Sequence, residues 1–464
     1  MIFMQRLDAA YDAGSGHFIW LGASTTANND VTVVQPTAVA TGRWLRVYDD
    51  LEAGMFGARP VAGFDNTTAL TAIETFLRAE LAAFRKLPTV WVNAGTYESS
   101  VAPNWGIQGA TILNRGKVKI RGTGLGSAMI LDAGAAFGTN LTALTIGIGT
   151  GFVFENGPTA TSATVLVRNI YLSEIRGRVW GSGLTQAGWS ILGCVLSKFW
   201  IGTTPTESAE ETPADYTNGW YLGGKPLSGM TLNQSAANAQ TSYCIFYNWL
   251  GAACQIGMYV DSTLGNVWVG GDNEYNTDTG SIFTALSIGN RCTGLNHEVN
   301  TVSDVTCSGS FNQFDCDSVK FFFTGGSGNR LVGGMHDQVT ISGGTGNYVG
   351  EITYGRGLSG NLVIGDAGTR STFGWCYSAQ SQKWNRGPEA HAAITVGASP
   401  FVYTNTTGRP LKVFVTGGTV SNLSYFRGAS LLGVLTTDTM VELAPDDALS
   451  VTYSAAPTMN FASI

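Results

Sequence analysis

Three copies of one phrase constrain the fold of this chain more than any other feature. GNVWVGGDNE (265–274), GNRCTGLNHE (289–298) and GNRLVGGMHD (328–337) each suggest a turn, a short strand, a bend and a final carboxylate. Asparagines that align with the phrase recur at unequal spacings of 17 to 24 residues, at Asn248, Asn266, Asn290, Asn312, Asn329 and Asn347. Unequal spacing is typical of the coils of a solenoid whose loops vary in length.

The residues that follow these asparagines separate into two columns. Two positions later all are apolar, namely Leu250, Trp268, Cys292, Phe314, Leu331 and Val349. One position later most are polar or amphipathic, namely Trp249, Val267, Arg291, Gln313, Arg330 and Tyr348. Because strand side chains alternate between faces, the first column should point inward and the second outward. The asparagines should form a hydrogen-bonded ladder at a turn. We therefore predict an all-β fold, a right-handed parallel β-helix with coils about 4.8 Å apart.

The composition agrees with short strands and tight turns. Charged residues make up 13% of the 464 residues and 61 are glycine, whereas globular domains average about 25% charged residues. A net charge of −7 argues against a nucleic-acid partner. No apolar run is long enough for a signal peptide or a membrane span, so we expect a soluble protein without membrane insertion. Seven cysteines without a CxxC pair predict buried thiols made in a reducing cytosol, with no disulfide, metal or cofactor.

The chain divides into three expected parts. Residues 1–54 are too short for a core of their own and form an N-terminal attachment segment. Residues 55–385 form the β-helix, with the insertion at 203–219 as a surface loop. Residues 386–464 alternate like antiparallel strands and predict a β-sandwich-like domain for trimerisation or glycan binding. One helix is expected at 65–84, with Asp65 or Asn66 as N-cap, to cover the open end of the first coil; its apolar stripe is Ala69, Leu70, Ile73, Phe76, Leu77 and Leu81.

The region around this helix resembles a known group. MFGA (55–58), DNTTAL (65–70), VWVNAGTY (90–97) and KIRGTGLGSAMI (119–130) are similar to the opening of pectate-lyase-like β-helices, and most of all to bacteriophage tailspikes and tail-fibre depolymerases. The chain departs from that pattern at 59–64, where a glycine–aspartate stretch is usual, and at Asn93, where proline is common. The resemblance spans about 20–135 by motif and continues to about 370 by repeat.

The resemblance implies a homotrimer in the virion tail, made in the host cytoplasm and joined to the tail or baseplate through its N-terminus. It implies adsorption to a bacterial surface polysaccharide (capsule, exopolysaccharide or O-antigen), usually with cleavage of that glycan. It supplies no catalytic residue, because the carboxylates of this group share no sequence motif.

Candidate catalytic residues come from the repeat. Eight positions after the asparagines stand Glu274, Glu298, Lys320 and Asp337, and seven positions after stand Asn273, His297, Val319 and His336. Paired carboxylates suit glycoside hydrolysis. On adjacent coils Glu274 and Glu298 would be about 5 Å apart, the retaining geometry, whereas Glu298 and Asp337 would be about 10 Å apart, near the inverting range. Asp315 and Asp317 are alternative partners.

Other assignments remain open for these positions. His297 or His336, together with Arg291 or Arg330 and with Lys320, would suit a polysaccharide lyase or epimerase, which needs a base and a cation beside the substrate carboxylate. Trp249 and Tyr348 are candidates for stacking on sugars, and the arginines for pairing with acidic sugars. The ordinary alternative is a solvated carboxylate, a surface histidine and a buried Trp249. A receptor-binding fibre without catalysis is the third functional hypothesis.

Overall fold

The structure is a computed structural model, and it divides into two compact units, Met1–Gly280 and Ser281–Ile464. It describes residues 1–4, 15–28, 31–83, 85–134, 143–149, 151–156, 160–180, 187–204, 218–223, 240–354, 362–364, 371–379, 382–386, 391–406, 410–435 and 438–463. Most of the insertion expected as a surface loop at 203–219 lies outside these residues. Within them, no helix has the length and apolar character that a membrane crossing requires.

The first unit begins with a small antiparallel sheet. Its strands, in the order β1-β2-β4-β3, are β1 (Ile2–Met4), β2 (Gly16–Leu21), β4 (Arg43–Arg46) and β3 (Val33–Val34). The buried Arg46 crosses this layer with its guanidinium 4.6 Å from the ring centre of Phe18. The same guanidinium donates hydrogen bonds to the backbone oxygens of Val31 and Ser15, each at 2.8 Å. These bonds connect β4 to the residues that precede β2 and β3.

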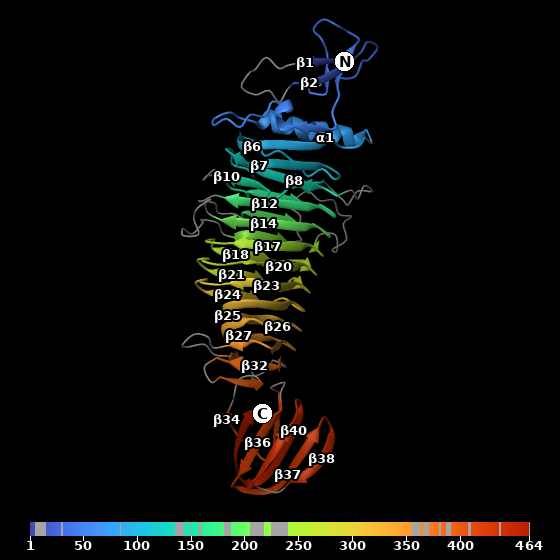
Figure 1. The fold of residues 1–464 in the computed structure, drawn as a ribbon. Coiled ribbons are helices and arrows are strands. Elements are labelled where there is room, and N and C mark those ends of the chain that lie inside the picture. Colours follow the sequence, from blue (N-terminus) through green and yellow to red (C-terminus); the bar gives the residue numbers. More distant parts are fainter. Residues whose placement is uncertain are drawn as a thin grey trace. The chain divides into compact units, whose positions relative to one another are not determined.

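A short 3-10 turn, η2 (Ala53–Phe56), and the helix α1 (Thr67–Ala82) follow. The helix confirms the predicted element, and Figure 1 shows it at the end of the stack beside β6. Its apolar stripe is buried from Ala69 to Leu77, and Leu81 is half-buried. Asn66 is the N-cap residue, but its side chain makes no cap bond, because its Oδ1 accepts the Arg59 N–H at 2.6 Å. The Asp65 carboxylate instead accepts the Thr67 N–H at 3.0 Å.

Parallel coils make up the rest of the first unit. Their strands are β5 (Asp50–Glu52), β6 (Thr89–Ser99), β7 (Thr111–Gly122), β8 (Met129–Asp132), β9 (Thr145–Ile146), β10 (Phe152–Asn156), β11 (Val165–Arg168), β12 (Glu174–Trp180), β13 (Trp189–Leu192), β14 (Lys198–Thr204), β15 (Asn218–Gly223), β16 (Thr241–Ser242), β17 (Ile245–Gly251), β18 (Ile256–Val260), β19 (Thr263–Leu264) and β20 (Val267–Asp272). Each face pairs in parallel with the same face of the next coil, as in the series β5–β6–β7–β10–β12–β14–β17–β20. This is the predicted parallel β-helix.

The second unit continues with the same architecture, and β21 (Thr279–Phe283) contains the division point. Its coil strands are β22 (Ser287–Ile288), β23 (Arg291–His297), β24 (Ser303–Cys307), β25 (Gln313–Ser327), β26 (Arg330–Val332), β27 (Met335–Thr345), β28 (Tyr348–Gly350), β29 (Thr353–Tyr354), β30 (Leu362–Ile364), β31 (Thr372–Phe373), β32 (Trp375–Ser378) and β33 (Lys383–Arg386). The pairing is parallel from β23 to β32, and β32 pairs with β33 antiparallel.

The expected asparagine ladder holds the coils of the second unit together. Asn290, Asn312 and Asn329 each donate their backbone N–H to the Oδ1 of the next asparagine, at 3.0, 2.9 and 3.0 Å. All four members, which end at Asn347, are buried. An unpaired amide in this position would cost about 1–3 kcal/mol, so the ladder explains why asparagine recurs here.

The residue before each ladder position adopts left-handed backbone geometry. Glycine fills it at Gly289, Gly328 and Gly346, with φ between 64° and 67°. Phe311 fills it on the coil of Asn312, with φ 57°. A Cβ on Gly328 would come within 2.8 Å of the Phe311 ring. The Gly-Asn pair of the repeated phrase is therefore a turn that L side chains rarely adopt, followed by a ladder residue.

The predicted inward column is confirmed in five of its six members, with one error of alignment. Trp268, Cys292, Phe314, Leu331 and Val349 are almost fully buried. On the remaining coil the ladder position is held by Cys244, whose N–H donates to the Asn266 Oδ1 at 2.9 Å. Asn248 is an exposed residue with φ 47°, so its alignment with the ladder was wrong. The shift also reverses Trp249, which is 1% exposed instead of facing outward.

The C-terminal residues form two antiparallel four-stranded sheets, as the β-sandwich prediction requires. One sheet has the order β34-β41-β36-β39 and the other β35-β40-β37-β38. The strands are β34 (His391–Ile394), β35 (Phe401–Thr404), β36 (Leu411–Thr416), β37 (Thr419–Arg427), β38 (Ser430–Leu435), β39 (Thr439–Leu443), β40 (Asp447–Ala455) and β41 (Thr458–Ser463). One apolar core joins residues from both sheets, including Val413, Leu423, Val451 and Met459.

The cysteines behave as predicted. All seven are free and buried. Burial raises the pKa of the Cys244 thiol to about 12, and it raises the pKa of Cys194 well above its ordinary value. These thiols are apolar packing groups at neutral pH.

Candidate functional site

Two histidines of the repeated phrase stack inside the second unit. The β23–β25 and β25–β27 registers place His297, Ser318 and His336 opposite one another on three successive coils. The Ser318 hydroxyl lies 2.7 Å from His336 Nδ1, and His336 Nε2 lies 3.2 Å from the Gly333 oxygen. Because a carbonyl oxygen can only accept, Nε2 carries the proton and Nδ1 accepts from Ser318.

The burial of these histidines corrects the expectation that they lie at the surface. His297 and His336 are at most 1% exposed. Burial lowers the pKa of His297 to about 3 and that of His336 to about 4. Both rings are therefore neutral at pH 7, and proton acceptors with so low a pKa are weak general bases. The structure gives them a packing and hydrogen-bonding role in the wall behind the carboxylates.

The carboxylates follow this stack along the chain. Glu298 comes directly after His297, and Asp337 directly after His336, while Val319 holds the equivalent position on the coil between them. Glu298 and Asp337 are thus two coils apart, about 10 Å between backbone positions. The predicted separation of these two carboxylates by two coils agrees with the strand register.

The predicted place of Lys320 is wrong by one residue. It pairs with Gln338, whereas Val319 aligns with the two carboxylates. The cause is one extra residue between the asparagine and the carboxylate on each neighbouring coil. On β23 this residue is Gly294, which has φ 65° and has no partner position in the pairing with β25. On the coil of Asn329, two glycines with positive φ at 333–334 precede β27. The coil of Asn312 lacks this glycine, so counting from the asparagine overshoots there.

A hollow of about 350 Å³ opens beside this column. Its lining residues are His297, Glu298, Val299, Asp317, Ser318, Val319, Met335 and Asp337. Glu298 is exposed and Asp317 and Asp337 are half-buried, so all three carboxylates are open to a ligand. The Asp317 Oδ1 accepts the Met335 N–H at 2.7 Å, which fixes its direction. Three acids and the exposed apolar side chains of Val299, Val319 and Met335 share one depression.

A buried aspartate supports the floor of the hollow. Asp304 is 1% exposed, and its Oδ2 accepts the backbone N–H groups of Val319 and Lys320. Its Oδ1 accepts the Asn300 amide at 2.6 Å. Burial raises the pKa of Asp304. One side chain therefore holds both the middle of β25 at Val319 and the segment that follows Glu298.

Two predicted carboxylates do not line the hollow. Asp315 lies two residues before Asp317 on β25, opposite Thr293, and a Cβ on Gly333 would stand 2.6 Å from its Oδ1. Glu274 belongs to the first unit, where it is half-buried. Its pairing with Glu298 stays a prediction.

The outward column beside the ladder is present without Trp249. Arg291, Gln313, Arg330 and Tyr348 stand opposite one another on consecutive coils. The Arg330 guanidinium lies 5.1 Å from the centre of the Tyr348 ring. Trp249 is buried, so its predicted stacking on a sugar is excluded. The other members present cations and an aromatic ring at the strand face next to the ladder.

Counting residues missed Val319, Met335 and Asp304. The first two become visible only when the glycines at 294 and 333–334 are treated as bulges. Asp304 had no periodic signal, because it lies in β24, outside the repeated phrase. In the part of the chain that the structure describes, no three acidic, histidine or cysteine side chains are arranged to hold a metal ion.

Comparison with known proteins gives similarity of structure only. No family model and no curated protein matches the sequence. The enzymatically active domain of tailspike protein 2 from bacteriophage CBA120 aligns with 100% of this chain and 83% of its own, at 12% identity and TM-score 0.48. The tailspike protein of Acinetobacter baumannii phage AM24 aligns with 100% of this chain and 90% of its own, at 13% identity and TM-score 0.39. The mannuronan C-5 epimerase AlgE6 A-module of Azotobacter vinelandii aligns with 71% of this chain and 99% of its own, at 12% identity and TM-score 0.39.

Proposed function

We propose that this chain is a bacteriophage tailspike that binds a bacterial surface polysaccharide and hydrolyses its glycosidic bonds in the hollow of the second unit. One observation carries the proposal: Glu298 and Asp337 occupy the same column two coils apart, with Asp317 beside them and Val319 between. Solvent-accessible carboxylates that face one depression are the groups that glycoside hydrolysis uses.

The spacing favours inversion at the anomeric carbon. Inverting enzymes hold their two carboxyl groups roughly 6.5–9.5 Å apart, because a water molecule must fit beside the sugar. A separation of about 10 Å between backbone positions allows the side chains to fall in that range. One carboxylic acid would protonate the glycosidic oxygen as its bond to the anomeric carbon breaks. The other would take a proton from the water whose oxygen forms the new bond.

The charges in the hollow favour hydrolysis over β-elimination. A lyase removes a proton next to a carboxylate, so it needs a cation to stabilise the developing negative charge. No lysine or arginine is among the described residues that line the hollow, and its histidine is buried and neutral at pH 7. Three carboxylates would repel a uronic acid. The bond cleaved is therefore best placed next to a neutral or amino sugar.

The biological setting of the proposal comes from the sequence resemblance. Assembly as a homotrimer, attachment to the phage tail through the N-terminus, and trimerisation or glycan binding by the sandwich stay predictions.

Analysis of the products tests the proposed reaction. The protein is incubated with the surface polysaccharide of the host, and new reducing ends, ultraviolet absorbance and the first anomer formed are followed. Hydrolysis gives reducing ends without the absorbance of an unsaturated uronate, and inversion shows in the NMR signal of the first anomer. Strong absorbance would establish a lyase, altered sugars without chain cleavage an epimerase, and an unchanged polymer a binding fibre. Each of these would overturn the proposal.

A further inference from the structure

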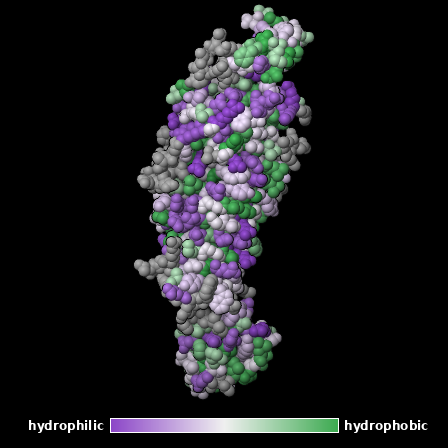
Figure 2. Space-filling model, viewed as in Figure 1, coloured by the Kyte–Doolittle hydropathy of each residue, from purple (hydrophilic) through white to green (hydrophobic). Residues whose placement is uncertain are grey.

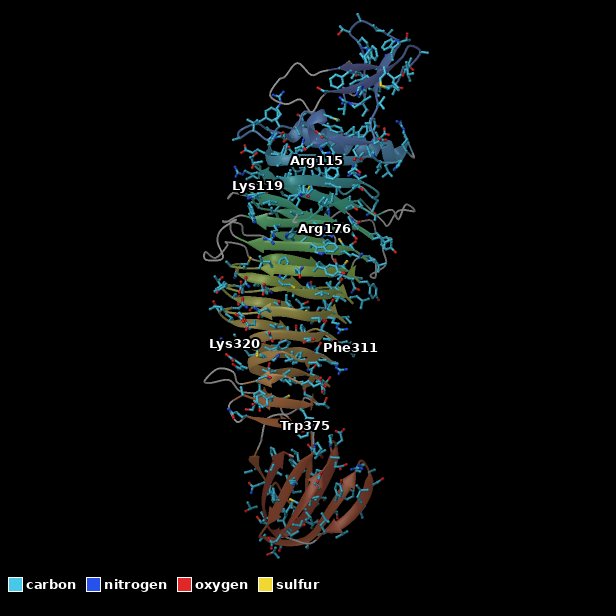
Figure 3. The ribbon with its side chains drawn as sticks, in the orientation of Figure 1. Arg115, Lys119, Arg176, Phe311, Lys320 and Trp375 are labelled. Carbon is cyan, nitrogen blue, oxygen red and sulfur yellow. The ribbon has the colours of Figure 1, made fainter. Side chains whose placement is uncertain are left out.

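The coils of the first unit carry an unusual concentration of cations on their outer face. Seven of the 26 lysines and arginines lie on three strands, β7, β12 and β14, at Arg115, Lys117, Lys119, Arg121, Arg176, Arg178 and Lys198. All alternate with buried residues or stand at the bend in β7, so they point outward. Figure 3 labels Arg115, Lys119 and Arg176 on these coils, and Figure 2 shows hydrophilic residues gathered over the first coils of the viewed face.

Aromatic rings continue one cation column along the coils. Arg176, Trp200 and Tyr247 occupy equivalent outward positions on β12, β14 and β17. The Arg176 guanidinium lies 3.7 Å from the centre of the Trp200 ring. Trp200 stacks on Tyr247 with ring centres 4.8 Å apart and planes at 14°. The three half-buried groups form a rigid stack that holds the guanidinium at its end.

The same arrangement recurs on neighbouring strands. Lys117 and Lys119 both lie over the Trp180 ring, at 4.7 and 4.8 Å from its centre. Arg115 lies 4.9 Å from the centre of the Trp91 ring. Four cation–π contacts therefore lie on the coils from β6 to β14.

The charges on this surface are only partly neutralised. Lys119 and Arg121 pair with Glu155 at 2.9 and 3.1 Å, and Arg121 also pairs with Glu98 at 3.3 Å. Arg115 pairs with Glu52 at 2.6 Å and Lys198 with Glu174 at 3.4 Å. Among the described residues, Arg176 and Arg178 have no carboxylate within ion-pair distance. They stand two residues apart on β12 in a chain of net charge −7. A guanidinium group is suited to bidentate capture of a carboxylate, and that of Arg176 is held in place by its stack on Trp200.

We propose that the outer face of β7, β12 and β14 is a second glycan-binding surface, which recognises the carboxylates of an acidic polysaccharide through Arg176 and Arg178. It extends the proposed function by giving the same polymer a second contact, but it does not rest on cleavage at the hollow. The hollow suits a non-acidic sugar, and this surface suits an acidic one.

Binding of defined uronate polymers tests this surface. We would measure polygalacturonate, alginate and hyaluronate by calorimetry, with methyl-esterified polygalacturonate as the uncharged match. The Asp337→Asn variant is used throughout, so that no cleavage can alter the polymer. Binding is expected to at least one acid polymer, to be lost on esterification, and to weaken as salt rises, because exposed charges are screened beyond about 10 Å at 0.1 M.

Paired variants locate the binding. Arg176→Gln combined with Arg178→Gln should weaken binding roughly tenfold or more, because both charge-assisted contacts to the carboxylates are lost. Lys86→Gln combined with Lys412→Gln removes the same charge elsewhere and should leave binding unchanged. Equal binding of the esterified polymer, equal loss in both variants, or no binding to any acid polymer would overturn the proposal. The esterification result needs no variant, so it stands even if the arginine variant fails to fold.

Discussion

The outer face of β12 and the hollow beside β25 are built from the same kind of coil, yet they carry opposite charges. The outward positions of β12 include Arg176 and Arg178, which follow Glu174, and those of β25 include Asp315 and Asp317. Behind each, the inward positions are buried apolar residues such as Ile175 and Phe314. The inward columns therefore specify the solenoid, while the outward columns are free to vary with function.

The register of the coils explains why one surface is a stack and the other a hollow. β12 and β14 pair without interruption over seven residues, so equivalent side chains align and stack, as Arg176 does on Trp200. β23 and β25 pair with a shift at Gly294, and the Glu298 column comes after it. A bulge redirects the residues that follow it. Regular pairing thus produces a ladder of contacts, and the bulge accompanies the depression.

The largest expected effect is on the rate of catalysis, which depends on the hollow. Asp337→Asn should lower the rate of polysaccharide cleavage by about 10²–10⁴-fold, the usual contribution of a general acid or base. Asp315→Asn is the matched control, because this carboxylate lies on the same unit but does not line the hollow. Reducing-end assays on both variants measure the difference. If Asp315→Asn were the more damaging change, the catalytic assignment to the hollow would be wrong.

A second comparison concerns two tryptophans of the first unit. Trp249→Ala should destabilise the protein by about 3–5 kcal/mol, because a fully buried ring leaves a cavity. Trp200→Ala should cost less, since that ring is half-exposed in the outward stack. Thermal melts of both variants measure this order. A larger loss for Trp200→Ala would contradict the corrected alignment.

The buried histidines should make the region around the hollow more sensitive to acid than the outer face of β12. Their pKa values are lowered on folding, to about 3 for His297 and about 4 for His336. Below about pH 6.5 the unfolded chain binds these protons and the folded chain does not, so stability falls as the pH drops toward 4. The loss should be on the order of 3 kcal/mol for each ring.

Urea unfolding between pH 7 and pH 4 measures this dependence. The double variant with His297→Gln and His336→Gln should be less stable at pH 7 but show a shallower decline. His17→Gln, which changes an exposed histidine, should decline as the unmodified protein does. Parallel declines in all three proteins would show that the buried rings do not set the acid sensitivity.

The smallest expected effect is a difference in stability between variants of two neighbouring residues in the repeated phrase. Asn329→Ala should cost about 1–3 kcal/mol, because the buried Asn312 N–H loses its acceptor. Arg330→Ala should change stability by about 0.5–1 kcal/mol at most, the worth of its contact with Tyr348. Melting temperatures compare the two. Equal losses would mean that the ladder contributes no more than the surface.

The fold was accessible from the sequence because its signals are periodic. The ladder contains Asn312 and Asn329, and the core contains Phe314 and Leu331. The Gly-Asn turn is part of the repeated phrase. The site was only partly accessible. Counting from the asparagines located Glu298 and Asp337. The position of Val319 could be found only if Gly294 was recognised as a bulge. Trp249 was predicted to face outward because Asn248 was wrongly aligned with the ladder. Burial of His297 and His336 depends on packing across coils, which no count along the chain measures.

The structure of a complex with a cleaved oligosaccharide tests the central claim most directly. The protein would be crystallised with the fragments that it releases from its host polysaccharide, in the Asp337→Asn form. A sugar ring is expected to lie across Val319, with carboxylates of Glu298 and Asp317 within hydrogen-bond distance of its hydroxyl or glycosidic oxygens. An oligosaccharide bound elsewhere on the chain with the hollow empty would contradict the proposed site.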